Sequence, residues 1–182
     1  MKKFVSILIF SFLSNFLVWS FETDISLFSE MTSAYNSGFY PGAIQHAERL
    51  IKNFPDSVFI ANGYVIKGEC HVRLGQLEEA EDALKNALVV TEKNSTLNLA
   101  CVYWLARTYE LTKRYEEALS EYHTYCKFAT LGGTYYPNAI VNSGKVFYQL
   151  KDYKNAIPLF EYCVSNGKKY TASVFNDALL KL

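Results

Sequence analysis

Apolar residues recur in steps of three and four positions at four places along the chain. Each place centres on an alanine (Ala43, Ala80, Ala118 or Ala156), and successive alanines are 37, 38 and 38 residues apart. Apolar residues also stand three positions before and four positions after these alanines, at Tyr40 and Ala47, Leu77 and Leu84, Tyr115 and Tyr122, and Tyr153 and Phe160. Such steps place side chains on one face of an α-helix. The pattern therefore predicts four amphipathic helices.

A second helix is predicted before each of these four. Twelve residues before each alanine stands Met31, Gly68, Ala106 or Gly144, and nine residues before it stands Ala34, His71, Tyr109 or Phe147. A small residue one helical turn from a large one lets two antiparallel helices approach closely and still fill the space between them. Short polar turns, NSGF, LGQL, TKRY and LKDY, join the helices of each pair. We therefore expect four helical hairpins in a row.

The order of aromatic and small residues in these hairpins resembles the tetratricopeptide repeat, or TPR. The third unit carries the pattern best, through Trp104, Leu105, Ala106, Tyr109, Tyr115, Ala118 and Tyr122. The spacing is longer than the usual period of roughly 34 residues, and in this it resembles TPR proteins of bacterial envelopes, such as the Tol-Pal-associated periplasmic protein. The resemblance implies an all-α fold, a right-handed superhelical solenoid of about four antiparallel helix hairpins over residues 21–171.

Both ends of the chain differ from the repeats. Residues 1–20, MKKFVSILIFSFLSNFLVWS, have two lysines, an apolar run and small residues near Ser20, which predicts an export signal and a bacterial protein of the periplasm or exterior. The alternative is an uncleaved helix that anchors the protein in a membrane. Residues 172–182 contain SVFNDALLKL, which echoes SVFIANGYVIKG in the second unit. This segment is expected to be a capping helix or the first half of a further repeat.

Composition and charge argue against several functions. The 18 basic and 18 acidic residues balance, so the positive charge typical of nucleic-acid binders is missing. The three histidines fall in three different units, and no nucleophile, base and orienting group stand in a recognisable pattern. We therefore predict no enzyme activity, no metal and no cofactor. His71 stands where neighbouring units have Tyr109 and Phe147, so we expect it to pack in the core.

The four cysteines, Cys70, Cys101, Cys126 and Cys163, all fall in predicted helices, and buried thiols are the favoured interpretation. Export would place them in an oxidising compartment, where a bridge could form. Cys101 and Cys126 lie 12 and 13 residues on either side of Lys113, in the turn of the third hairpin. They would then face each other across two antiparallel helices, so a Cys101–Cys126 disulfide is the alternative.

The resemblance also implies a binding surface, because the first helix of each TPR hairpin lines the inner face of the solenoid, where extended peptides or partner helices bind. On that face we place Phe28, Tyr35, Asn62, Val65, Glu69, Arg73, Tyr103, Arg107, Glu110, Asn138, Val141, Lys145 and Tyr148. Amides suit a peptide backbone, and Tyr and Arg are common binding anchors. TPR proteins that clamp a C-terminal carboxylate use Lys and Asn here, but the first unit has Phe28 and Thr32, which argues against such a clamp.

These observations predict an exported TPR scaffold that holds a protein or peptide of the cell envelope on its concave face. Two alternatives remain open at this point. One is a structural envelope protein that assembles with copies of itself, and the other is a membrane-anchored scaffold that keeps its first helix.

Overall fold

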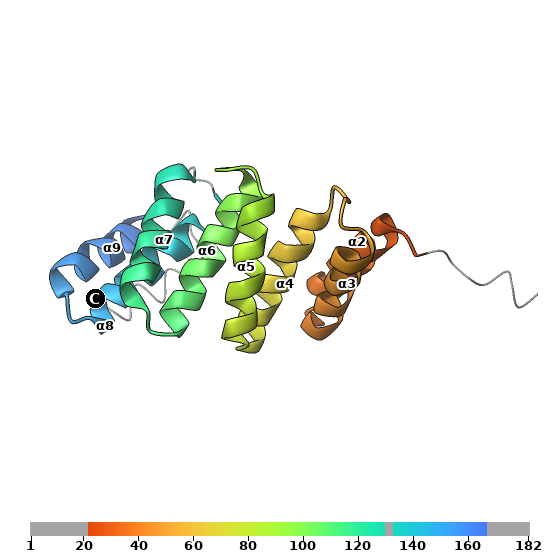
Figure 1. The fold of residues 1–182 in the computed structure, drawn as a ribbon. Coiled ribbons are helices and arrows are strands. Elements are labelled where there is room, and N and C mark those ends of the chain that lie inside the picture. Colours follow the sequence, from red (N-terminus) through yellow and green to blue (C-terminus); the bar gives the residue numbers. More distant parts are fainter. Residues whose placement is uncertain (1–21, 130–132, 167–182) are drawn as a thin grey trace, which may run out of the picture.

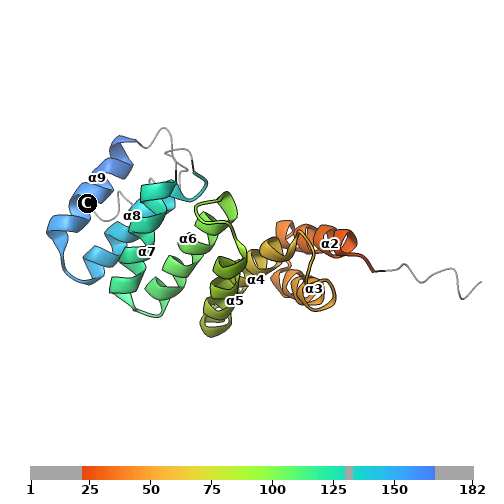
Figure 2. The ribbon, with the colours of Figure 1, turned by 45° about the horizontal axis from the view of Figure 1, so that its top comes forward.

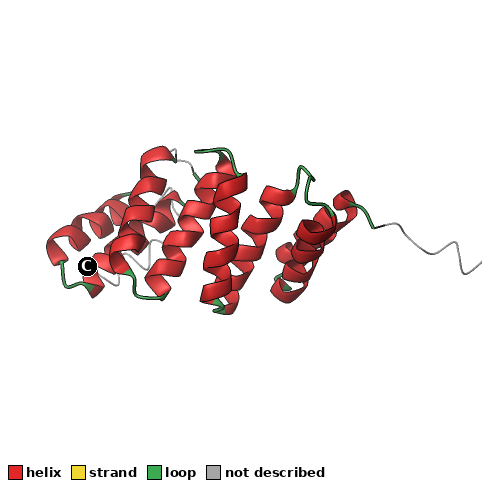
Figure 3. Cartoon of the chain, in the orientation of Figure 1, coloured by secondary structure: helices red, strands yellow, loops and turns green. Residues whose placement is uncertain are grey.

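A computed structural model describes residues 22–129 and 133–166 of the chain. Within these ranges all the regular structure is helical, and no strand occurs (Figure 3). The helices are α2 (Asp24–Asn36), α3 (Tyr40–Asn53), α4 (Ile60–Leu74), α5 (Leu77–Val90), α6 (Thr96–Leu111), α7 (Tyr115–Phe128), α8 (Tyr136–Gln149) and α9 (Tyr153–Ser165). The all-α prediction is confirmed for this part of the chain.

Successive helices pack as four antiparallel hairpins, α2–α3, α4–α5, α6–α7 and α8–α9. Each hairpin also packs on the next, through α3–α4, α5–α6 and α7–α8 contacts, so the helices form one elongated row (Figures 1 and 2). The first helices of neighbouring hairpins meet as well, because α4 contacts both α2 and α6. This arrangement places α2, α4 and α6 on a common side of the row.

The predicted contacts within the hairpins are confirmed. The four central alanines are completely buried: Ala43, Ala80, Ala118 and Ala156. A Cβ atom added to Gly68 would lie 2.5 Å from Leu84 of the facing helix, and one added to Gly144 would lie 2.7 Å from Phe160. No side chain fits at such distances without displacement. The glycines therefore let a large residue of the second helix reach the backbone of the first.

The four turns inside the hairpins share one backbone shape. Each has a single residue with a positive φ angle near its centre, Gly38 at 78°, Gly75 at 75°, Lys113 at 61° and Lys151 at 59°. Glycine adopts this left-handed conformation freely, whereas lysine does so with some strain. The last two hairpins thus have the same turn geometry as the first two, although lysine replaces glycine at the central position.

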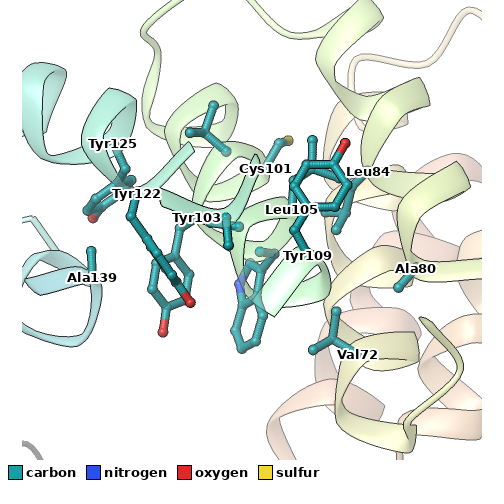
Figure 4. Close-up of a cluster of buried hydrophobic side chains, with 14 of the residues drawn as sticks. Val72, Ala80, Leu84, Cys101, Tyr103, Leu105, Tyr109, Tyr122, Tyr125 and Ala139 are labelled. Carbon is teal, nitrogen blue, oxygen red and sulfur yellow. The ribbon is translucent and has the colours of Figure 1, made fainter. Parts of the chain in front are cut away.

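The largest core cluster surrounds α6, which contributes Tyr103, Trp104 and Tyr109 among its buried residues. Tyr122 and Tyr125 of α7 complete it from the next helix, and Figure 4 shows Tyr103 and Tyr122 side by side with their hydroxyl groups on the same side. Smaller clusters lie in the first hairpin and in the last. The buried aromatic side chains of this cluster are therefore gathered on α6 and α7.

Two predictions fall outside the described residues. The export signal at residues 1–20 and the terminal segment at residues 172–182 both lie there, so the structure says nothing about either. Among the helices of residues 22–129 and 133–166, none combines the length and the apolar character that a membrane span needs.

Candidate binding groove

A groove of about 490 Å³ opens between α4, α6, α8 and the loop that precedes α8. It is lined by Val72, Arg73, Tyr103, Trp104, Arg107, Leu111, Thr134, Tyr135, Asn138, Asn142 and Lys145. Five residues that the sequence assigned to the binding face meet here, namely Arg73, Tyr103, Arg107, Asn138 and Lys145. The groove thus draws on the first helices of three successive hairpins.

Three aromatic rings form the apolar part of the groove. Tyr103 and Tyr135 stack in parallel with ring centroids 4.4 Å apart, and Trp104 meets both rings edge-on at 5.2 and 5.6 Å. The backbone N–H of Tyr135 donates to the hydroxyl of Tyr125 at 3.0 Å, which fixes the loop before α8 against α7. The rings are therefore held in place by one another and by a hydrogen bond to the core.

The indole N–H of Trp104 has only a weak partner at this site, the phenol of Tyr135. The residue is only 7% exposed, and no acceptor among the described residues stands in hydrogen-bond geometry with its buried Nε1–H. The indole lies close enough to Tyr135 to influence the pKa of that phenol, which burial raises and the indole partly lowers. The nitrogen itself is buried, so a ligand in the groove does not reach it unless the ring moves.

Arg73 is held at the groove by a buried carboxylate. Its Nε and Nη2 atoms donate to Oε1 of Glu69 at 3.0 and 2.6 Å, and the hydroxyl of Tyr35 donates to the same oxygen at 2.5 Å. The guanidinium also lies over the rings of Tyr40 and Trp104, with centroids at 5.5 and 5.1 Å. Glu69 is only 4% exposed, so this cluster joins α2, α3, α4 and α6 around one buried charge.

A second cluster of the same composition holds Arg107. The Nη1 atom of Arg107 donates to Oε2 of Glu110 at 2.6 Å, and the hydroxyl of Tyr122 donates to that oxygen at 2.5 Å. All three residues belong to the third hairpin, because Arg107 and Glu110 lie on α6 and Tyr122 lies on α7. The side chain of Glu110 keeps 16% of its surface exposed, so it is less deeply buried than Glu69.

These clusters fix the charge states of the two arginines and of Tyr35. Burial alone would lower the pKa of both arginines. Glu69 more than offsets this for Arg73, and Tyr122 and Glu110 more than offset it for Arg107, so both guanidinium groups stay charged. Burial and the Glu69 hydrogen bond raise the pKa of Tyr35, which remains a neutral donor. Glu69 and Glu110 lie behind the surface of the groove, and among the described lining residues there are three cations and no carboxylate.

A second hollow, of about 510 Å³, lies at the opposite end of α6 and has a different character. It is lined by Asn94, Thr96, Leu97, Leu99, Ala100, Tyr125, Phe128, Ala129, Gly133, Thr134 and Tyr135. None of these described lining residues carries a charge, so the positive charge of the groove is a local property.

The other predicted binding residues lie elsewhere, and three of them require correction. Val65 and Val141 are core residues, with only 5% and 1% of their surface exposed. Phe28 stacks on Phe59 at 4.2 Å and packs against the core of the first hairpin. These side chains were assigned to the open face by helical spacing alone. Val65 belongs to the core cluster around α6, Val141 packs against α9 of its own hairpin, and Phe28 is half-buried against the first cluster.

The remaining assignments fall at the edges of the binding face. Tyr35, Glu69 and Glu110 support the two arginines, as described above, and do not line the groove themselves. Asn62 is half-buried on α4, and Tyr148 meets Tyr153 edge-on at 5.4 Å near the turn of the last hairpin. The structure thus separates the predicted surface into a groove, its buried supports and an outer edge.

Six lining residues were missed from the sequence, Val72, Trp104, Leu111, Thr134, Tyr135 and Asn142. Thr134 and Tyr135 precede α8, outside the predicted helices. Trp104 was used only as part of the repeat pattern. The available signal was the pair of tyrosines at residues 135 and 136, because large aromatic side chains are usually buried in part.

The cysteines are free thiols in this structure, and Cys101 and Cys126 are not bonded to each other. Cys101 donates to the carbonyl oxygen of Leu97 at 3.0 Å, and burial raises its thiol pKa to about 12. Burial also raises the pKa of Cys126 to about 11, with a smaller contribution from Cys163. The environments favour unreactive thiols, and the disulfide stays a prediction that a thiol count would test.

The histidines lie apart from the groove. His71 is buried, as expected, and its Nδ1 atom is 2.8 Å from Oε1 of Gln76, while His46 pairs with Glu30 at 3.1 Å. No group of three or more His, Cys, Asp or Glu side chains within residues 22–129 and 133–166 could hold a metal ion. The groups that the groove offers to a ligand are aromatic rings, amides and cations.

The comparison with protein families decides the kind of protein. A family profile for the tetratricopeptide repeat matches residues 29–98 and 71–129, which together are more than half of the chain. The chain is a tetratricopeptide repeat protein. TPR proteins are scaffolds that bind other proteins, and the four hairpins have the sequential contacts typical of the family.

Solved structures share the TPR fold at low sequence identity. A tetratricopeptide repeat protein from Parabacteroides merdae is 20% identical over 87% of this chain, with a TM-score of 0.66, and this chain spans only 57% of its length. MamA from Desulfovibrio magneticus RS-1, from residue 41 to its end, is 15% identical, with a TM-score of 0.68 and coverage of 82% of this chain and 78% of MamA. No curated protein matches the chain.

Proposed function

We propose that this TPR protein binds an extended segment of another protein in the groove between α4, α6 and α8. The observation that carries the proposal is the meeting of five predicted binding residues from three hairpins in one groove of about 490 Å³. Rings, amides and guanidinium groups together suit a peptide, whose backbone needs hydrogen-bond partners and whose side chains need apolar contacts. A neighbouring fold is found in an assembly, the structure of Naa15/Naa10 bound to HypK-THB, with a TM-score of 0.55.

The groove is pre-organised for such a partner. The two arginines are oriented by Glu69 and Glu110, and Tyr103 and Tyr135 hold each other by stacking. Side chains that are already fixed lose little conformational entropy when a ligand binds. Most of the conformational entropy lost on binding is therefore lost by the partner, which we propose to be a segment that is flexible before it binds.

We further propose that the protein acts in a bacterial cell envelope as an exported scaffold. The support is the sequence of residues 1–20, with its lysine pair, apolar run and small residues near Ser20. N-terminal sequencing of the protein purified from its source cells tests this directly. A first residue of Phe21 supports export and cleavage, whereas a retained Met1 in a membrane fraction favours the anchored scaffold.

Site-specific photo-cross-linking in the source cells tests the binding proposal. A benzophenone-bearing amino acid would replace Asn138 in the groove and, as a matched control, Lys154 on the exposed side of α9. We expect the groove position to capture a discrete protein that the control position does not capture. Equal products from both positions, or none from Asn138, would overturn the proposal. A product that contains two copies of this chain would favour the self-assembling alternative.

A further inference from the structure

We propose that the groove selects an acidic segment, in which aspartate or glutamate side chains face Arg73, Arg107 and Lys145 and an apolar side chain lies against Leu111. This inference rests on the proposed function, because it names the chemistry of the partner segment that the groove would bind. It differs from recognition of a C-terminal carboxylate, since the charged groups lie on three separate helices along the groove and require no chain end.

The first line of support is the charge of the lining. Arg73 lies on α4, Arg107 on α6 and Lys145 on α8, and the described lining residues include no aspartate or glutamate. The chain as a whole has equal numbers of basic and acidic residues, and a glutamate stands behind each arginine, so the excess of positive charge is limited to the described lining itself. Electrostatic complementarity of this kind determines which partners are accepted and raises the rate at which they associate.

The hydrogen-bond donors of the groove give a second line of support. A guanidinium group has five N–H groups, and the printed bonds to the carboxylates use two of them on Arg73 and one on Arg107. A carboxylate supplies two acceptor oxygens and can bind a guanidinium in a bidentate way, so it matches this set of donors.

The carboxylates behind the surface do not cancel this preference. Glu69 and Glu110 lie outside the lining and are more buried than the arginines they bind. The guanidinium groups therefore form the surface that a ligand would meet. The side chains of Arg73 and Arg107 are 38% and 25% exposed, whereas those of Glu69 and Glu110 are 5% and 16% exposed. A ligand therefore approaches the positive end of each pair first.

An apolar neighbour distinguishes this groove from a site for a simple anion. Leu111 lines the groove one helical turn after Arg107 and keeps 44% of its surface exposed. Val72, on α4 beside Arg73, is also part of the lining. Covering Leu111 removes apolar surface from water, which favours a segment with a large apolar residue next to its acidic ones. A free phosphate or a small dicarboxylate would leave this surface exposed.

Single-stranded nucleic acid is the other polyanion that a site with cations and rings could attract, and the geometry disfavours it. Bases bind such proteins by stacking on open aromatic faces. Here the face of Tyr103 is already covered by Tyr135, with centroids 4.4 Å apart and planes 4° apart, and Arg73 lies over the ring of Trp104. The rings are thus occupied by the protein itself, which leaves the hydrogen-bonding and charged groups for the ligand.

Selection from a random peptide library displayed on phage tests the inference, with the full chain immobilised as the target. We expect the selected peptides to be enriched in Asp and Glu next to Leu, Phe or Tyr. Their affinity, measured by fluorescence anisotropy on labelled synthetic copies, should fall as the salt concentration rises, because charges at an open groove are screened. A version with each acidic residue changed to its amide should bind at least about tenfold more weakly.

Two charge-reversed proteins locate the binding site. Lys145→Glu changes the lining, and Lys154→Glu makes the same change on the exposed side of α9, outside the lining. Both variants have the same net charge, and neither position lies in the core. We expect Lys145→Glu to weaken binding of the acidic peptides by about tenfold or more, and Lys154→Glu to leave it within about twofold of the parent.

The outcomes separate this inference from the proposed function. Acidic peptides that lose affinity only with Lys145→Glu support both. If the selected peptides are neutral or basic and their affinity changes with Lys145→Glu but not with Lys154→Glu, the preference for acidic segments is overturned. The groove then remains the binding site. If no selected peptide responds to Lys145→Glu more than to Lys154→Glu, and cross-linking at Asn138 also captures no protein, both proposals fail.

Discussion

The clusters around Glu69 and Glu110 contain the same three groups but connect different parts of the molecule. In the first, Tyr35 comes from the first hairpin, whereas Glu69 and Arg73 come from the second. In the second, Arg107, Glu110 and Tyr122 all belong to the third hairpin. The first cluster is therefore a joint between repeats, and the second is a brace within one repeat.

This difference shows that one polar arrangement can serve two mechanical purposes in a solenoid. Contacts between hairpins determine how cooperatively the row unfolds, and contacts within a hairpin determine the intrinsic stability of that unit. Loss of the Glu69 cluster should therefore loosen α2 and α3 from the rest. Loss of the Glu110 cluster should affect mainly α6 and α7. Both changes also reach the groove, because each cluster holds one of its arginines.

The largest effect is expected from Arg73→Leu. Removal of the guanidinium leaves the carboxylate of Glu69, with 5% of its side chain exposed, without its cation, and we expect the free energy of unfolding to fall by about 3–5 kcal/mol. Arg107→Leu should lower it by about 1–3 kcal/mol, because Glu110 is more exposed and can be hydrated. Urea denaturation followed by circular dichroism measures both. Equal losses would show that the joint and the brace contribute alike.

A smaller loss is expected at the apolar contact between α8 and α9. Gly144→Leu would force a side chain into Phe160, which stands 2.7 Å from the position of an added Cβ, and should lower the free energy of unfolding by about 3 kcal/mol. Gly144→Ala is the milder control and should cost about 1 kcal/mol. A melting temperature equal to that of the parent would mean that α8 and α9 do not pack in this register.

The two tyrosines give the sharpest test of joint against brace. Tyr35→Phe and Tyr122→Phe each remove one hydroxyl donor to a carboxylate, and each should lower the free energy of unfolding by about 1–2 kcal/mol. Hydrogen exchange should distinguish them. Tyr35→Phe should speed exchange in α2 and α3, whereas Tyr122→Phe should speed it in α6 and α7. The comparison would collapse if both variants changed the same helices.

Alkaline pH should give the smallest effect. Burial and the bond to Glu69 raise the pKa of Tyr35 above its ordinary value of 10, so the folded state keeps a proton that the unfolded state releases. The stabilisation is thus complete below pH 10 and is lost as the pH rises further. We expect the free energy of unfolding of Tyr35→Phe to decline less steeply than that of the parent between pH 9 and 11 (urea titrations). Parallel curves would contradict the assignment.

The fold was largely predictable from the sequence because its signals are local. The steps of three and four around Ala80 and Ala118 depend only on helix geometry, and the pairing of Gly144 with Phe160 follows from the size difference between facing residues. Because the turns are short and polar, each helix can pack only antiparallel to the helix that follows it in the chain. Each of these inferences needs no knowledge of distant residues.

The groove was only partly predictable because it depends on how neighbouring hairpins are placed. Arg73 and Arg107 could be assigned to the open face from spacing, since charged groups seldom enter a core unpaired. The burial of Val65 depends on how the second and third hairpins pack, and the position of Tyr135 over Tyr103 depends on an irregular loop. Sequence spacing within one helix contains no information about either.

Trp104 gives the protein an optical signal at the groove. The chain has two tryptophans, Trp19 and Trp104, and Trp19 lies in the segment proposed to be removed on export. After such removal Trp104 is the sole indole, placed among Tyr103, Tyr135 and Arg73 in the lining of the groove. Its emission spectrum should therefore respond when a ligand excludes water from the groove. The natural chain would report its own occupancy without any attached dye.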